Sequence, residues 1–305
     1  MNFTRSLFTV AILGAVALGF IWPASGLWAG PFLSYILMAM MFFSCLNINL
    51  SDLKKTRQMW WRYFFILIFI FVLPAAVAFL FRNLMDSQIY AGLILAAAVP
   101  SAVSVVALSH ILGGQPDKAL VATTLAHLLS PLATPLVVLL FAGQAAAINF
   151  GSIFWLIAKL IFIPLAAAQF VRFLGWHKKM RAYSAPLNVL LLIIIVLGII
   201  APASGLARAH FWELFLVGGI VCVILFLEVV VSIWFGRTKK EDITWAVVDT
   251  YKNFTLSSVV ALQAFGPLAV LGSVAYSVLD NFLIAGLQWW ARRKRGTFGL
   301  RRPKG

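Results

Sequence analysis

The chain has 305 residues, of which 63% are hydrophobic and 11% charged, and its mean hydropathy is +0.99. Soluble domains contain about 45–50% apolar and about 25% charged residues. The composition therefore excludes a soluble protein and predicts an integral membrane protein. In a soluble chain the net charge of +15 would suggest nucleic acid as a partner, but the placement of the basic residues excludes that partner.

Ten apolar segments are long enough to cross a bilayer, which takes about 20 helical residues. The first of them continues through Trp22 and Pro23 without a small-residue cleavage site, so we expect a retained helix rather than a signal peptide. Short connections leave no room for an inserted soluble domain. We expect an all-α membrane protein with spans near residues 6–23, 31–50, 60–82, 88–112, 118–142, 150–173, 183–202, 211–235, 243–264 and 267–291.

The 24 Lys and Arg residues lie mainly on one flank of these spans. The opposite flank carries only Arg82 and Arg208, while Lys159 and Lys252 fall inside spans. By the positive-inside rule the basic flank faces the cytoplasm. We expect a multi-pass protein of a bacterial cytoplasmic membrane with both termini in the cytoplasm. Residues 292–305 would form a basic cytoplasmic tail that anchors the topology near anionic headgroups.

Two spans carry polar interruptions near their middle. The fourth contains Pro100 within residues 100–104, and the ninth contains residues 249–253. Interrupted segments at matching positions of two halves indicate an inverted repeat with a site at the membrane midplane. We expect helices 1–5 within residues 1–145 and helices 6–10 within residues 146–291. Pro100 alone is also compatible with a simple kink, which transmembrane helices tolerate.

The ninth span brings an acid, a base and an amide together. If it is helical, Asp249, Lys252 and Asn253 share one face at spacings i, i+3 and i+4. Ionisable groups at membrane depth are costly and usually mark a pathway or a site. This set can hold a small cation or exchange a proton. The alternative is an Asp–Lys pair that only joins helices.

Further polar groups in neighbouring spans are expected to line a cavity. Any single hydroxyl can instead bond to a carbonyl one turn earlier, and His127 can relay protons or pack as a neutral group. Asp280 and Asn281 can reach the site from the tenth span, and the role of Glu228 in the eighth stays open. The hydroxyl set comprises Ser101, Ser104, Ser109, Thr123, Thr124, Ser130, Thr134, Thr255, Ser257 and Ser258.

Signatures of catalysis and of metal binding are weak. Cys45 and Cys222 lie inside spans, and no His, Cys or carboxylate spacing predicts a metal site. There is no phosphate-binding loop, zinc-protease motif or nucleophile elbow. An intramembrane enzyme or a non-transporting sensor remains an alternative, with Ser130 and His127 as the candidate nucleophile and base.

Several segments resemble the bile acid:sodium symporter family. Residues 42–53 resemble the end of that family's second helix. Residues 101–104 with the Gly-Gly turn that follows, then residues 119–124 and 133–136, are similar to its fourth and fifth helices. Asp249 and Asn253 are similar in type and spacing to its glutamate-x-x-x-glutamine on helix nine. The resemblance covers most of the chain.

The resemblance implies both a fold and an activity. The fold would be a five-plus-five inverted repeat with core and panel domains and crossed discontinuous helices four and nine. The activity would be sodium-coupled uptake of an organic anion without a prosthetic group. By position, Asp249 and Asn253 match sodium ligands on helix nine, Ser104 falls where the family has an asparagine ligand, and Thr123 or Thr124 lies near its hydroxyl ligands.

Lys252 is the main departure from that pattern, because it places a positive charge among the expected sodium ligands. The Asp–Lys arrangement also resembles that of sodium/proton antiporters, which implies proton coupling or a cation-independent mode. We predict a secondary transporter that moves a small organic anion by alternating access, coupled to sodium, to a proton or to a built-in lysine that replaces sodium. An efflux carrier of similar architecture is a second alternative.

The expected site has two groups of residues. The partners would be the lipid bilayer and the anion, and a monomer would suffice. The cation-coupling group comprises Asp249, Lys252, Asn253, Ser104, Thr123 and Thr124, and the substrate-binding group comprises Ser101, His127, Ser130, Thr255, Ser257, Asp280 and Asn281.

Overall fold

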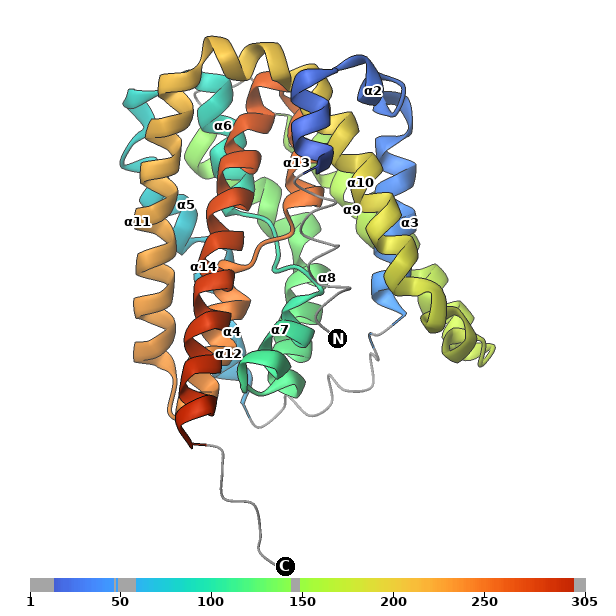
Figure 1. Cartoon of the computed structure of the whole chain (residues 1–305), viewed down its shortest axis with the longest axis vertical. Coiled ribbons are helices and arrows are strands. Elements are labelled where there is room, and N and C mark those ends of the chain that lie inside the picture. The colour runs from blue at the N-terminus through green and yellow to red at the C-terminus, as the bar shows by residue number, and fades with distance from the viewer. Residues whose placement is uncertain (1–13, 47, 49–58, 144–148, 299–305) are drawn as a thin grey trace, which may run out of the picture.

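The computed structural model describes residues 14–46, 48, 59–143 and 149–298, which form helices and an isolated antiparallel bridge (Figure 1). A first helix ends at residue 21. The following elements are α2 (Ala24–Leu27), η1 (Gly30–Phe32), α3 (Leu33–Cys45), α4 (Trp60–Phe71), α5 (Leu73–Phe79), η3 (Arg82–Leu84), α6 (Ser87–Ala97), α7 (Val105–Leu112), α8 (Pro116–Ala142), α9 (Phe150–Phe173), α10 (His177–Ala209), α11 (Phe211–Phe235), α12 (Lys239–Thr250), α13 (Phe254–Ala264), η4 (Pro267–Ala269) and α14 (Val270–Phe298).

Seven helical stretches of the described residues are long and apolar enough to cross a bilayer, so the chain is a multi-pass membrane protein. They are Ala24–Cys45, Trp60–Phe79, Pro116–Ala142, Phe150–Phe173, His177–Ala209, Phe211–Phe235 and Pro267–Leu287. The predicted fourth and ninth spans are instead divided, into α6 with α7 and α12 with α13. The predicted span 6–23 is described only from residue 14 on, and the count of ten stays a prediction.

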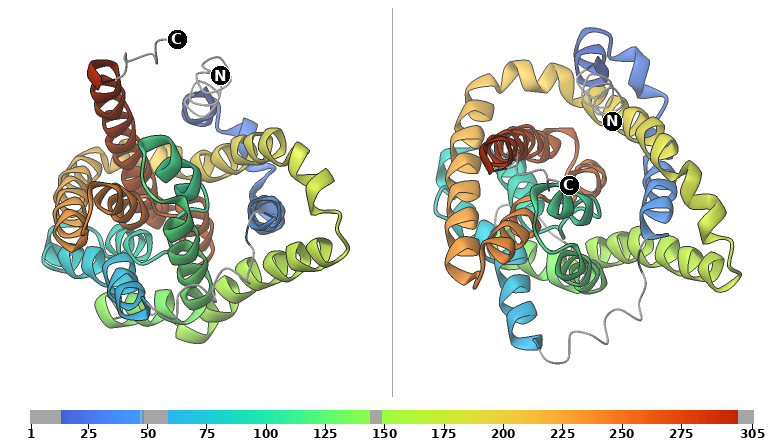
Figure 2. Two further views of the ribbon diagram at one scale, coloured as in Figure 1. Left: turned by 90° about the horizontal axis from the view of Figure 1, so that it is seen from below. Right: turned by 60° about the horizontal axis from the view of Figure 1, so that its bottom comes forward.

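The helices form two neighbouring groups (Figure 2). In one, α3 packs against α9 and α10, and α10 also packs against α2. In the other, α6 packs against α5, α8 and α14, while α11 packs against α12 and α14. Contacts of α9 with α8 and α13 join the groups. The divided helices therefore lie within the second group, close to α11 and α14.

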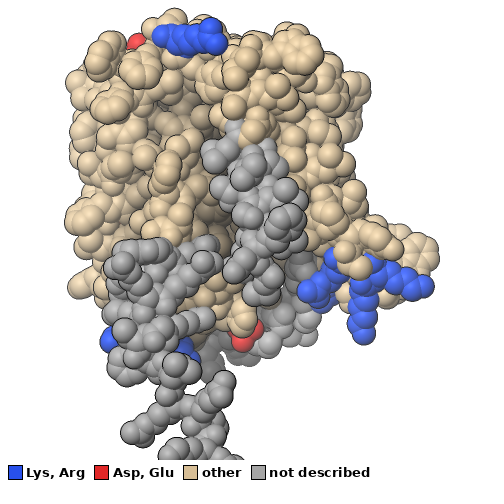
Figure 3. All heavy atoms as spheres, viewed as in Figure 1, with Lys and Arg blue, Asp and Glu red and all other residues tan. Residues whose placement is uncertain are grey.

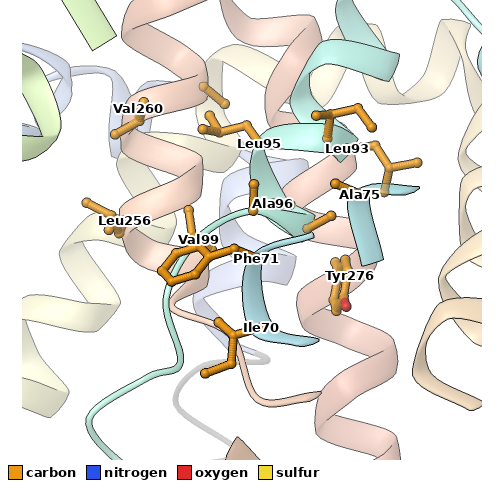
Figure 4. Packing of buried hydrophobic residues seen from close by; sticks show 14 of the residues in the cluster. Ile70, Phe71, Ala75, Leu93, Leu95, Ala96, Val99, Leu256, Val260 and Tyr276 are labelled. Carbon is orange, nitrogen blue, oxygen red and sulfur yellow. The ribbon is translucent and has the colours of Figure 1, made fainter. Parts of the chain in front are cut away.

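Buried apolar side chains from distant parts of the sequence meet around α6 (Figure 4). Ile70 and Phe71 of α4, Leu93 and Ala96 of α6 and Val260 of α13 are all at most 2% exposed. Lipid tails are as apolar as these side chains, so close packing rather than water exclusion must hold the helices together. The core thus depends on shape as well as on hydrophobicity.

Glycine allows α6 to approach the start of α14 closely. A Cβ atom added to Gly92 would lie 1.8 Å from the carbonyl oxygen of Ala269, and one added to Gly272 would lie 2.5 Å from the backbone nitrogen of Leu93. Small residues at helix contacts are typical of membrane proteins, where they let backbones touch. This contact fixes α6 against α14 on the side of the bundle that holds the divided helices.

On the face that Figure 3 shows, the charged side chains of the described residues lie near the two ends of the molecule, with an uncharged band between them. Phe162 in the middle of α9 and Phe226 in the middle of α11 stay exposed, at 41% and 67%. Exposed aromatic groups at this level are expected where the surface faces lipid. On this face the band agrees with a surface that lies in the bilayer.

A network of charged groups ties together the ends of four helices near the start of α12. The carboxylate of Glu241 accepts hydrogen bonds from Lys118 of α8, from Arg62 of α4 at 2.9 Å and from the backbone N–H of Arg237 at 3.0 Å. Arg62 also donates to the Phe235 carbonyl oxygen at the end of α11. Burial opposes ionisation, but these donors lower the pKa of Glu241 to about 2.

We expect Glu241→Gln to lower the free energy of unfolding by about 2–3 kcal/mol, because hydrogen bonds to charged groups contribute about 1.5–3 kcal/mol each. The unfolded pKa of Glu is about 4.3, so a pKa lowered to about 2 stabilises the fold above pH 4.3, and that stabilisation is lost as the pH falls towards 2. Thermal unfolding in detergent across this range should show the loss in the wild type and not in the variant. An equal acid response in both would contradict the assignment, and Asp117→Asn, at an exposed position of α8, serves as the control.

Candidate functional site

The fourth and ninth predicted spans are both broken where the sequence places polar residues. α6 ends at Ala97 and α7 begins at Val105, and the segment between them contains Pro100. Proline lacks an amide hydrogen and disfavours helical geometry in the residue before it. α12 ends at Thr250 and α13 begins at Phe254, so Lys252 lies in a break rather than on a helix.

The two breaks are hydrogen-bonded to each other. Ser101 and Lys252 form an antiparallel bridge. The Ala102 N–H donates to the Tyr251 carbonyl oxygen, and the Asn253 N–H donates to the Pro100 carbonyl oxygen, both at 2.8 Å. Non-helical backbone at membrane depth must satisfy its polar groups inside the protein. Here each break supplies hydrogen-bond partners for backbone groups of the other.

Lys252 is buried and has two partners. Its ammonium donates to the Ile70 carbonyl oxygen at 2.6 Å and lies 3.1 Å from Glu228 Oε1 of α11. The Ile70 carbonyl is available because residue 74, which would bond to it in a continuous helix, is a proline without an amide hydrogen. The Tyr276 hydroxyl of α14 donates to Glu228 Oε2 at 3.0 Å.

Asp249 is not the ion-pair partner of Lys252 that the helical spacing suggested. Its Oδ2 accepts a hydrogen bond from the Ser232 hydroxyl of α11 at 2.5 Å. The expectation of a shared face required a continuous helix, and α12 ends at Thr250, before Lys252. The ammonium therefore pairs with Glu228 of another helix. Asp249 Oδ1 has no hydrogen-bond partner among the described residues.

Asp280 lies in α14 and is fully buried. Neither of its carboxyl oxygens has a hydrogen-bond partner in the described part of the chain. It lies within electrostatic range of Glu228 and Lys252. The neighbouring Asn281 is exposed and accepts a hydrogen bond from the Tyr251 hydroxyl at 3.3 Å. Asp280 and Asn281 thus have different surroundings, although the sequence suggested one role for both.

Asn253 acts mainly as a helix cap. Its side-chain oxygen accepts from the Leu256 N–H at 3.2 Å and from the Thr255 hydroxyl at 3.0 Å, which closes the N-terminus of α13. Its amide nitrogen contacts Met41 Sδ of α3 at 3.6 Å. The carboxamide oxygen of Asn253 therefore serves helix structure in this conformation, while Asp249 points to Ser232.

Most of the remaining predicted hydroxyls bond to backbone carbonyls. Ser101 donates to the Val248 carbonyl at 2.5 Å, which fastens one break to α12. Thr124 and Ser257 bond to carbonyls of their own helices. The Thr123 hydroxyl is buried without a partner among the described residues. Ser104, at the start of α7, is exposed and makes no side-chain cap.

Ser130 and His127 do not form a nucleophile and base. The Ser130 hydroxyl donates to the backbone carbonyl of His127 at 3.0 Å, and His127 Nδ1 lies 2.8 Å from the Thr123 carbonyl oxygen. Both side chains are buried in α8. The described residues also contain no group of three His, Cys, Asp or Glu side chains that could hold a metal ion.

The role of Glu228 stayed open in the sequence, and the structure makes this residue the direct partner of Lys252. A deeply buried acid in an apolar span, facing a span with a buried base, was the available signal. Pro74 was a second signal, because it frees the Ile70 carbonyl one turn earlier. The contacts of Lys252 with Glu228 and with the Ile70 carbonyl could not be read from one sequence.

Comparison with known proteins gives one family match and several relatives. The model of the SBF-like CPA transporter family matches residues 6–279. The chain is 23% identical to the uncharacterized sodium-dependent transporter YocS of Bacillus subtilis over 96% of this chain and 93% of the relative. It is 28% identical to sodium/bile acid cotransporter 7 of Mus musculus over 55% of this chain and 53% of the relative. Sodium/bile acid cotransporter 7-A of Xenopus laevis is 26% identical over 63% and 60%.

Proposed function

Because the chain belongs to the SBF-like CPA transporter family, we propose that it is a secondary transporter that moves a small organic anion by alternating access and couples this movement to a cation. The observation that carries the proposal is the pair of helix breaks joined beside a buried, charged cluster. Broken helices at membrane depth are the usual place for substrate and ion sites in secondary transporters.

The proposed architecture is a five-plus-five inverted repeat, with residues 1–145 and 146–291 as its halves and with crossed discontinuous helices four and nine. Its support is that the break before Val105 and the break before Phe254 pair with each other. In this reading α6 with α7 and α12 with α13 are the two discontinuous helices. The grouping of α2 and α3 with α9 and α10 would correspond to a panel domain.

An organic anion is the proposed substrate. Helix N-termini attract negative charge through their free N–H groups and the helix dipole. Ser104 is exposed at the start of α7 and leaves that end without a side-chain cap, whereas Asn253 closes the start of α13. The names of the mouse and frog relatives include bile acid, which is an organic anion.

The proposed location is a bacterial cytoplasmic membrane, with the basic end of the bundle and both termini on the cytoplasmic side. Support comes from the concentration of Lys and Arg in the connections on that flank and in residues 292–305. The chain would act as a monomer without a prosthetic group, with Na⁺ or a proton as the coupling ion.

Uptake by proteoliposomes tests the function. With radiolabelled taurocholate as the first of a panel of carboxylate probes, an imposed inward gradient of the coupling cation should drive accumulation. Asp249→Asn should reduce it at least tenfold, equivalent to about 1.4 kcal/mol, because the amide cannot take up and release the cation. Asp117→Asn, at an exposed position, should transport like the wild type. Uptake that ignores both sodium and proton gradients, or that survives Asp249→Asn, would contradict the proposal.

A further inference from the structure

A group of five buried side chains between α11, α12 and α14, called here the polar cluster, contains more acid than base. It comprises Glu228, Asp249, Lys252, Tyr276 and Asp280. None of these side chains is more than 1% exposed. The three carboxyl groups and one ammonium would carry a net charge of −2 if all were ionised.

A net charge of −2 inside the buried polar cluster would strongly destabilise the folded protein. An unbalanced buried charge costs several kcal/mol even after the protein relaxes around it. Lys252 and Glu228 neutralise each other across 3.1 Å. The excess negative charge therefore belongs to Asp249 and Asp280. Two positive charges must accompany these two groups in the folded protein.

The hydrogen bonds of the cluster agree with that division. Glu228 accepts from Tyr276 and faces the ammonium, as an ionised carboxylate would. Asp249 accepts from one donor, Ser232, and Asp280 has none among the described residues. A carboxylate without donors is poorly stabilised, whereas a protonated carboxyl group needs far less.

A proton meets this demand better than sodium does. A hard cation requires a shell of several converging oxygen ligands, whereas Asp249 has the Ser232 hydroxyl as its one hydrogen-bond partner and Asp280 has none among the described residues. The ammonium of Lys252 already occupies the position beside Glu228 and would repel a second cation. A proton needs only one oxygen, and Asp249 and Asp280 each have an unpartnered one.

We propose that the coupling ions are protons, and that Asp249 and Asp280 each hold one in the polar cluster while Lys252 and Glu228 stay paired beside them. This inference rests on the proposed function. Each proton binds as the O–H bond of a neutral carboxylic acid and leaves to water when the cluster is opened during transport. Asp280 is then part of the ion site rather than of the substrate site.

The ionisable groups that face Asp249 and Asp280 are mostly members of the cluster itself. α11 contributes Glu228, the break between α12 and α13 contributes Lys252 and also Tyr251, and α14 contributes Tyr276. α4 contributes only the Ile70 carbonyl. Tyr90 of α6 bonds instead to the Phe141 carbonyl of α8.

Infrared spectroscopy of the purified full chain in liposomes tests the inference without a transported substrate. Exposed Asp and Glu are ionised at neutral pH, since their pKa values lie near 4, so a carboxylic-acid C=O band there reports buried protonated acids. We expect this band in the wild type. Labelling aspartate with ¹³C should shift it, and replacing potassium by sodium should leave it unchanged. The labelling and the cation exchange are both done on the wild-type protein.

Variants assign the band to residues. Asp249→Asn and Asp280→Asn should each remove one of two contributions, while Asp117→Asn should remove none. Asp280→Asn should also unfold close to the wild-type temperature, because an amide has nearly the shape and charge of a protonated acid.

Absence of the band, or its disappearance when sodium is added, would overturn proton binding in favour of sodium or of ionised carboxylates. After either result, the uptake experiment still tests separately whether the protein is a transporter. Loss of uptake under every gradient with the band intact would instead reject the proposed function.

Discussion

We expect Lys252→Met to lower the free energy of unfolding by about 3–5 kcal/mol, which is the usual cost of removing one partner of a buried ion pair. The methionine would leave Glu228 without its counter-ion and the Ile70 carbonyl without its donor. Both groups are inside the bundle, where water cannot replace the lost partner. Chemical or thermal unfolding in detergent measures the effect.

A second substitution separates the ion pair from the packing of the lysine stem. In Lys252→Met with Glu228→Gln the unpaired charge is gone, so most of the lost stability should return. The glutamine can still accept the hydrogen bond from Tyr276. If the double variant is as unstable as Lys252→Met alone, the lysine acts through its shape or its Ile70 contact, and the pair with Glu228 is incidental.

The second large effect concerns Gly92. We expect Gly92→Ala to cost about 3 kcal/mol or more, because the new methyl group would overlap the Ala269 carbonyl and force α6 away from η4. Since α6 leads directly into the first break, uptake should fall together with thermal stability. Size-exclusion profiles and unfolding temperatures of the purified variant provide the measurement.

Gly219→Ala is the matched control for this substitution. Gly219 lies in α11, and nothing approaches an added Cβ within 4 Å. Alanine also favours helix over glycine, so this variant should be as stable as the wild type or slightly more so. Equal behaviour of the two alanine variants would show that the α6 contact can relax at little cost.

The membrane class and the family were predictable from the sequence. Hydropathy alone placed spans such as 150–173 and 211–235, and these agree with α9 and α11. Motif spacing in the ninth span, with Asp249 and Asn253 four residues apart, led to the family that the comparison confirms. Pro100 and the polar residues around Lys252 likewise indicated where helices break.

The partners inside the site were not predictable. The sequence suggested Asp249 for Lys252 because helical spacing was the available geometry, but the break turns the ammonium towards Glu228. Asn253 has the spacing of a sodium ligand, yet its oxygen caps α13. Local rules describe contacts within one helix, whereas Glu228, Ser232 and Ile70 come from other helices and depend on how the bundle packs.

The pairing between the breaks has a mechanical consequence. Four helix segments meet at one small patch of backbone. There the Ala102 and Asn253 N–H groups each donate a hydrogen bond to a carbonyl oxygen of the opposite break. Side-chain changes at Ser101 or Lys252 leave these bonds in place, because they belong to the main chain. The patch therefore holds α6, α7, α12 and α13 together at this point, because separating the two breaks would leave these amides without acceptors in surroundings that offer no replacement.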